Sequence, residues 1–216
     1  MATTSNPLIG NASGSVGGVT MSKWKGINVI KAKPTSVAQP PSQTRTMRQA
    51  ALSAMVAIYR LISSVINTTY KSLATNMSAY NAFTSYNLKN AFDYTSPPTP
   101  TLNPELLLTS KGTIAATAAL TAILDVSDKL LTVTYPTSVA GANQSATDRV
   151  VVVVYNATKD TWEGAVLATA RSAGTAIYTP ANTYEALDSA DVYFSFVSAD
   201  GSKASDSVYF HDIIQA

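Results

Sequence analysis

Ser96-Pro97-Pro98-Thr99-Pro100 divides the sequence into two parts with different hydrophobic patterns. Clustered prolines exclude helix and favour an extended, semi-rigid linker. Before this stretch apolar residues recur at intervals of three and four, and after it they alternate with polar ones. The sequence therefore predicts an α+β protein with an extended arm at 1–41, a helical hairpin at 42–95, a linker at 96–103 and a β-sandwich at 104–216.

Two helices are predicted before the linker. Ser42 is a suitable N-cap for the first helix, whose apolar stripe runs to about Leu73. The second helix follows residues 74–76. Because the link between them is short, the helices should pack as a hairpin and leave apolar surface for other parts of the assembly. The expected buried positions of the second helix are Met77, Tyr80, Phe83, Leu88, Ala91 and Phe92.

The part after the linker predicts short strands separated by turn signals. Asp200-Gly201 is typical of a hairpin turn, and residues 113–124 fit either a strand or a short helix. About seven strands are typical of an immunoglobulin-like or fibronectin-like sandwich. The candidate strands are 106–110, 130–135, 149–155, 164–170, 176–179, 192–198 and 207–213.

The first 35 residues are rich in Gly, Ser, Thr and Asn and cannot build a core alone. Two alternating pieces, 18–24 and 26–31, suit strand addition to another protein. Lysines around Trp24 allow nucleic-acid binding as an alternative, but they are few for that function, so we favour a protein partner. The predicted interface residues are Trp24, Ile27, Val29, Arg45 and Arg48.

The small net charge of +2 arises from two opposite charges along the chain. Residues 1–100 contain nine Lys or Arg and a single acid, Asp93, whereas residues 101–216 contain six Lys or Arg and twelve Asp or Glu. Such polarity indicates oriented association with a partner.

Catalytic and metal-binding patterns are missing from the sequence. The absence of cysteine and the single histidine, His211, exclude thiolate and histidine-rich metal sites. Gly10-Asn11-Ala12-Ser13-Gly14 lacks the lysine of a phosphate-binding loop, and no serine motif accompanies His211. Asp188 and Asp191 lack the spacing of a calcium loop and fit a solvated turn. We therefore expect no catalytic residue, no cofactor and no metal.

Targeting signals are also missing. The first fifteen residues lack the basic and apolar regions of a secretory signal, and we identify no apolar run near the ~20 residues of a membrane span. We expect a protein made in the cytoplasm without a membrane span.

Four groups of residues form a set of motifs: Gly14-Ser15-Val16-Gly17-Gly18-Val19, Trp24-Lys25-Gly26-Ile27, Gln43-Thr44-Arg45 with Arg48, and Met77-Ser78-Ala79-Tyr80-Asn81. Together they resemble a family of uncharacterised proteins of Bacteroidota and their tailed phages. These motifs cover roughly residues 10–95, and the remainder matches in layout only. The family has no assigned activity, and its members look like phage structural components with an Ig-like domain that decorates virions.

The leading hypothesis is a non-enzymatic virion structural protein, such as a capsid decoration, head-fibre, collar or tail component, that docks through its arm and helices. Its partners would be other virion proteins or copies of itself, with no small-molecule substrate. One alternative is a self-assembling filament or ring, in which basic and acidic halves meet. Another is a carbohydrate-binding or surface-binding adhesin that uses exposed Tyr178, Tyr184 and Trp162.

Overall fold

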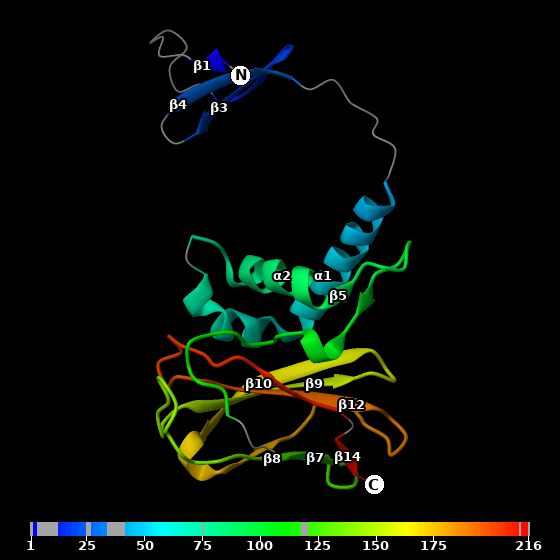
Figure 1. Ribbon diagram of the computed structural model, residues 1–216, viewed down its shortest axis with the longest axis vertical. Helices are drawn as coiled ribbons and strands as arrows, with labels where there is room; N and C mark the ends of the chain where they lie inside the picture. The colour runs from blue at the N-terminus through cyan, green and yellow to red at the C-terminus, as the bar shows by residue number, and fades with distance from the viewer. Residues whose placement is uncertain are drawn as a thin grey trace. The chain divides into compact units, whose positions relative to one another are not determined.

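The computed structural model describes residues 2–3, 13–24, 27–33, 42–74, 76–117, 121–211 and 213–215. The chain forms two compact units, Met1–Pro41 and Ser42–Ala216 (Figure 1). Among the described residues there are two α-helices and several sheets with mainly antiparallel pairing, which confirms the mixed α+β class.

The first unit is a four-stranded antiparallel sheet with the order β1-β4-β3-β2. We expected an extended arm whose strands pair with another chain. Instead, β3 and β4 pair with each other, because a short connection lets neighbouring strands satisfy their backbone hydrogen bonds. Gly17 has a φ of +54°, which favours glycine at the β2–β3 turn. The strands are β1 (Ala2–Thr3), β2 (Gly14–Val16), β3 (Val19–Trp24) and β4 (Ile27–Ala32).

The second unit begins with helix α1 (Gln43–Thr69), which has a kink at Ile62. Ser42 is the N-cap, as predicted, and its Oγ accepts a hydrogen bond from the backbone N–H of Arg45 at 3.3 Å. The α-helix ends at Thr69, before the expected end, and continues as the short 3₁₀ helix η1 (Lys71–Leu73). The Tyr70 hydroxyl donates to the Leu108 carbonyl oxygen at 2.9 Å, so the end of the helix is held by a distant segment.

Helix α2 (Ala79–Asn90) follows and packs against α1 through aromatic side chains. The ring of Tyr59 lies 4.9 Å from that of Tyr80, and the ring of Tyr70 lies 5.5 Å from that of Phe83. Of the expected buried positions, Met77 is instead half exposed. A two-stranded ribbon of β5 (Phe92–Asp93) and β6 (Thr101–Leu102) leads onward from the helices.

Two four-stranded sheets make up the rest of the second unit. The first has the order β10-β9-β12-β13, and the second has the order β11-β8-β7-β14. All pairs are antiparallel except β14 with β7, and the β9–β10 register shifts between Val166 and Ala170. The strands are β7 (Thr121–Asp125), β8 (Leu130–Thr134), β9 (Arg149–Asn156), β10 (Thr161–Ala170), β11 (Thr175–Tyr178), β12 (Ala190–Val197), β13 (Val208–Phe210) and β14 (Ile214–Gln215), with 3₁₀ turns η2 (Pro104–Leu106) and η3 (Arg171–Ala173).

The predicted strand at 106–110 is wrong, because the helix layer takes its backbone hydrogen bonds. The buried Asn87 side chain accepts a hydrogen bond from the Leu108 N–H at 2.9 Å and donates one to the Leu108 carbonyl oxygen at 3.0 Å. These bonds replace the ladder bonds that a strand would make. The ambiguous stretch 113–124 contains β7, a strand.

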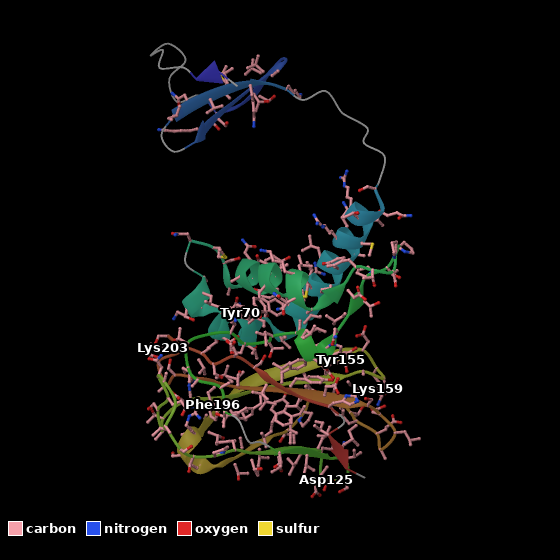
Figure 2. The ribbon with its side chains drawn as sticks, in the orientation of Figure 1. Tyr70, Asp125, Tyr155, Lys159, Phe196 and Lys203 are labelled. Atoms are coloured by element: carbon pink, nitrogen blue, oxygen red, sulfur yellow. The ribbon has the colours of Figure 1, made fainter. Side chains whose placement is uncertain are left out.

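The first sheet lies between the helices and the second sheet, so both of its faces are buried (Figures 1 and 2). On β9, Val151 and Val153 pack in the cluster shared with the helices, whereas Val150, Val152 and Val154 pack against the second sheet. A strand that is buried on both faces has a continuous run of apolar residues in its sequence, as β9 has. The segment 96–103, expected to link two domains, lies inside this one unit.

Helix α1 is long and apolar enough to cross a membrane by length and composition alone. We did not expect such a segment from the sequence. It is weak support for a membrane span, because a helix that packs in a protein core meets the same criteria. In this fold, Met55, Ile62 and Val65 of α1 are buried in the cluster shared with the first sheet.

Candidate docking surfaces

The sheet of β1 to β4, which we call the docking sheet, has apolar side chains and almost no core. Val16 lies opposite Val19, and Met21 lies opposite Ile30. Directly opposed residues of antiparallel strands share a face, so these four residues form one apolar face. Val16 is 71% exposed and Val19 is 36% exposed.

The predicted interface residues of the arm lie in a single ladder. Trp24 is paired with Ile27, and Val29 is paired with Ser22. Ile27 is 49% exposed, whereas Val29 is only 6% exposed. Val29 is therefore buried, whereas Ile27 offers exposed apolar surface.

The docking sheet belongs to a strongly basic segment. Residues 1–41 contain four lysines and no Asp or Glu. Lys23, Lys31 and Lys33 have exposed side chains. A surface of this composition attracts acidic partners over about one Debye length, roughly 10 Å at 0.1 M salt.

Arg45 and Arg48, the other predicted interface residues, belong to the second unit and line a hollow at the start of α1 that consists of two adjoining cavities, of about 510 Å³ and about 410 Å³, with Thr44, Arg48 and Leu88 in common. We call it the helix-end hollow. Met47 is buried there, whereas Arg45 and Arg48 are exposed. The first turn of α1 has no acidic residue, so its partial positive charge adds to that of the arginines. The lining residues are Ser42, Thr44, Arg45, Met47, Arg48, Gln49, Leu52, Leu88, Lys89 and Tyr94.

Sequence reasoning missed Met47, Leu88, Lys89 and Tyr94 as parts of this hollow. Its two sides come from the first turns of α1 and from the end of α2 with the residues after it. Burial raises the pKa of Tyr94. The stripe pattern places Met47 and Leu88 on apolar helix faces, but it does not show which helix ends meet.

His211 lies just after β13 and pairs with a buried carboxylate. Its Nδ1 is 2.7 Å from Oδ1 of Asp191 and 3.3 Å from the Tyr209 hydroxyl. Within the described residues, both hydrogen-bonded neighbours of the imidazole are therefore on the same sheet. A His–Asp pair can hold or transfer a proton, but nucleophilic catalysis needs a positioned hydroxyl or thiol as well. His211 is exposed, with 65% of its side chain accessible, and Asp191 anchors it.

The residues of the adhesin hypothesis are not free for a ligand. Trp162 is 5% exposed and packs with Tyr155 at a ring distance of 4.2 Å. Tyr184 is 9% exposed, and its hydroxyl donates to Glu163 at 2.7 Å. Burial is the main reason that the pKa of Tyr184 is raised. Tyr178 donates to the same carboxylate at 3.2 Å, so these tyrosines hold the fold together.

The two acids considered for calcium have other partners. Asp188 Oδ2 lies 2.9 Å from the Lys159 Nζ and accepts a hydrogen bond from the Asn156 amide at 2.9 Å. Asp188 is 7% exposed and Asp191 is 2% exposed, so these two carboxylates are buried and not solvated as expected. Among the described residues, no group of three His, Cys, Asp or Glu is arranged to hold a metal.

Comparison with known proteins gives a family but no activity. A search of the curated proteins found no match. Residues 11–211 match a family described as a family of unknown function, DUF6266. The match includes the docking sheet, the helices and both sheets of the second unit. Because it spans most of the sequence, the chain belongs to this family.

Proposed function

We propose that this chain is a non-enzymatic structural protein of a phage virion that attaches through its N-terminal docking sheet. The docking sheet would bind a capsid, collar or tail protein, and the second unit, whose pair of facing sheets would serve as an Ig-like domain, would project or contact a neighbour. The virion context comes from the family resemblance. The attachment mode rests on the physical chemistry of the sheet.

The observation that carries the proposal is the missing core of the docking sheet. Among the described side chains of residues 13–33, only Val29 is buried. Burying one such side chain contributes about 1.5–3 kcal/mol, whereas ordering each residue costs roughly 1–2 kcal/mol. A sheet with this balance needs a covered face to be stable. A partner that packs on Val16, Val19, Met21 and Ile30 would supply that cover.

The charge of the segment favours an acidic partner surface. Four lysines without an acid would steer the sheet toward negative charge, and the apolar face would then supply most of the affinity. Among the described strands β1 and β2 are at the edges of this sheet, and their outer backbone groups would accept a strand of the partner as well. The arginines of the helix-end hollow remain a second candidate contact.

Incorporation into particles tests the proposal. Full-length chain with Val16→Asp and Val19→Asp should be lost from purified virions, because both substitutions put charge on the apolar face. The matched control is Ser15→Asp with Thr20→Asp, whose positions are also paired but lie on the opposite face. The control should incorporate as the natural chain does.

Deletion of residues 1–33 is a second arm of the test. The deletion should abolish incorporation while the second unit stays folded, as judged by circular dichroism. Normal incorporation of the deleted chain, or of the Val16 and Val19 variant, would contradict attachment through the docking sheet.

A further inference from the structure

Leu187 presents an apolar side chain to solvent on a closed turn. It is 96% exposed, the highest value among the large hydrophobic side chains that the structure describes. The turn runs from Glu185 to Asp188, and the Asp188 N–H donates to the Glu185 carbonyl oxygen at 2.9 Å. A single exposed leucine needs no explanation by itself. Leu187 differs from an ordinary exposed leucine because of how its turn is held and which charges lie near it.

The buried carboxylate of Asp188 anchors the turn. Its Oδ2 accepts hydrogen bonds from the Asn156 amide at 2.9 Å and from the Glu185 N–H at 3.0 Å, and it lies 2.9 Å from the Lys159 Nζ. The hydrogen bond with Lys159 is the main cause of the lowered pKa of Asp188. A turn held in this way loses little conformational freedom when it binds.

The turn that carries Leu187 contains two acids, Glu185 and Asp188, which both form ion pairs with Lys159. The β7–β8 turn lies close by, because Asp125 and Lys129 line the same small cavity as Asn182 and Tyr184. Lys159, which also contacts this turn, is labelled in Figure 2. Negative groups outnumber positive ones at this end of the two sheets: Glu185, Asp188, Asp160, Asp125 and Asp128 against Lys159 and Lys129.

The helix-end hollow has the complementary chemistry. Its floor includes the buried Met47, and Leu52 at its margin is 41% exposed. Arg45, Arg48 and Lys89 bring positive charge to the rim. Its two adjoining cavities, of about 510 Å³ and about 410 Å³, are each many times the ~30 Å³ of one water molecule, so either can admit a leucine.

We propose that Leu187 of one copy inserts into the helix-end hollow of a second copy, with Glu185 facing Arg48. The turn joins the two sheets, whereas the hollow belongs to the helix layer, so the two surfaces are different parts of the same unit. A contact between different surfaces is head-to-tail. Repetition of a head-to-tail contact gives a ring where the rotation closes and a filament where it does not.

This contact is independent of the docking sheet. It uses residues of the second unit alone, and it adds a way for copies to associate beside one another once each is attached. The apolar insertion supplies affinity, while the charged rim supplies orientation and speed of association. Because exposed charges are screened by salt, the association should weaken as ionic strength rises.

Sedimentation of the full-length chain over a range of concentrations tests the apolar part. The natural chain should associate at low salt, and Leu187→Asp should weaken association by about tenfold or more, as expected for loss of a central anchor. Leu106→Asp is the matched control, because Leu106 is also exposed, at 54%, but lies outside both surfaces. The control should associate as the natural chain does.

Charge reversal tests the proposed pairing of Glu185 in one copy with Arg48 in the next. Arg48→Glu and Glu185→Lys should each weaken association, because like charges then meet across the contact. An equal mixture of the two variants should associate again, since each hollow in the mixture finds a turn of opposite charge on the other variant. Thermal unfolding of every variant checks that the second unit stays folded.

Three outcomes would overturn the proposal: a natural chain that remains monomeric up to its solubility limit, association that Leu187→Asp leaves unchanged, and a mixture that shows no recovery. Association that survives Leu187→Asp but is lost in Val16→Asp with Val19→Asp would assign self-association to the docking sheet instead. Loss of virion incorporation alone would concern the docking sheet and leave this contact as proposed.

Discussion

The guanidinium of Arg171 is completely buried between the two sheets of the second unit. Its Nε lies 3.4 Å from Oδ2 of Asp148, its Nη1 donates to the Thr117 hydroxyl at 2.9 Å, and the group lies 3.5 Å from the ring centre of Phe196. Burial lowers the pKa of Arg171, and Asp148 acts in the opposite direction. A buried charge of this kind depends on its partner.

Replacing Asp148 with alanine should destabilise the protein by about 3–5 kcal/mol, because it leaves the Arg171 charge buried without its counter-charge. Urea unfolding measures the difference. The control is Glu185→Ala, which removes an exposed partner of Lys159 and should change stability by less than about 1 kcal/mol. If the two substitutions lowered the free energy of unfolding equally, loss of the buried Arg171–Asp148 pair would be no more destabilising than loss of an exposed ion pair.

Among the elements, two chain segments cross closely where residues 110–115 meet residues 203–207. Ile114 forms a parallel bridge with Ser205, and the Ile114 N–H donates to the Ala204 carbonyl oxygen at 2.9 Å. A Cβ on Gly112 would lie only 2.1 Å from that same carbonyl oxygen. Glycine at 112 thus permits the close approach of the two backbones.

Gly112→Ala should therefore lower the free energy of unfolding by about 1–3 kcal/mol, since the added methyl group forces the two backbones apart. Thr113→Ala, at an exposed neighbouring position, should stay within about 0.5 kcal/mol of the natural chain. Chemical denaturation of both variants makes the comparison. A Gly112→Ala protein as stable as the control would contradict the close crossing.

The sequence predicts the elements whose pattern is local. The N-cap Ser42 and the stripe that follows it define the start of α1, and the apolar run at 149–155 defines β9. It does not predict interactions between distant residues. The segment 106–110 has strand-like composition, but Asn87 takes its backbone hydrogen bonds from 21 positions away.

For the candidate surfaces too, the sequence predicts local features but not contacts between distant residues. Arg45 and Arg48 stand out from the sequence as cations near a helix start, but Tyr94 reaches the hollow only after the chain turns back beyond α2. Leu187 gives a detectable signal, a leucine in a polar Glu-Ala-Leu-Asp turn between strands. That signal does not show exposure, because Tyr184 in the same loop is buried.

At the scale of the molecule, the two units have separate means of stabilisation. Both buried clusters consist only of residues from Ala51 to Ile214. The helices pack on one face of the first sheet and the second sheet packs on the other face. The helices and the two sheets should therefore unfold in a single transition. Among the side chains that the structure describes, none from the docking sheet belongs to either cluster.

Removal of residues 1–41 should leave the thermal midpoint of the second unit within about 2 °C of its value in the full chain, a change of less than about 1 kcal/mol for a unit of this size. Calorimetry of both proteins measures this. A much lower midpoint, or loss of the cooperative transition, would mean that the first unit supports the core of the second.

The register shift in β10 also affects how copies of the protein can meet. β10 is an edge strand of the first sheet, paired with β9, and its pairing is irregular between Val166 and Ala170. A long regular edge is a template for amyloid-like stacking, and a bulge twists that edge away from an incoming strand. The irregularity of β10 therefore protects this edge from pairing with the strand of another chain and so from fibrillar aggregation.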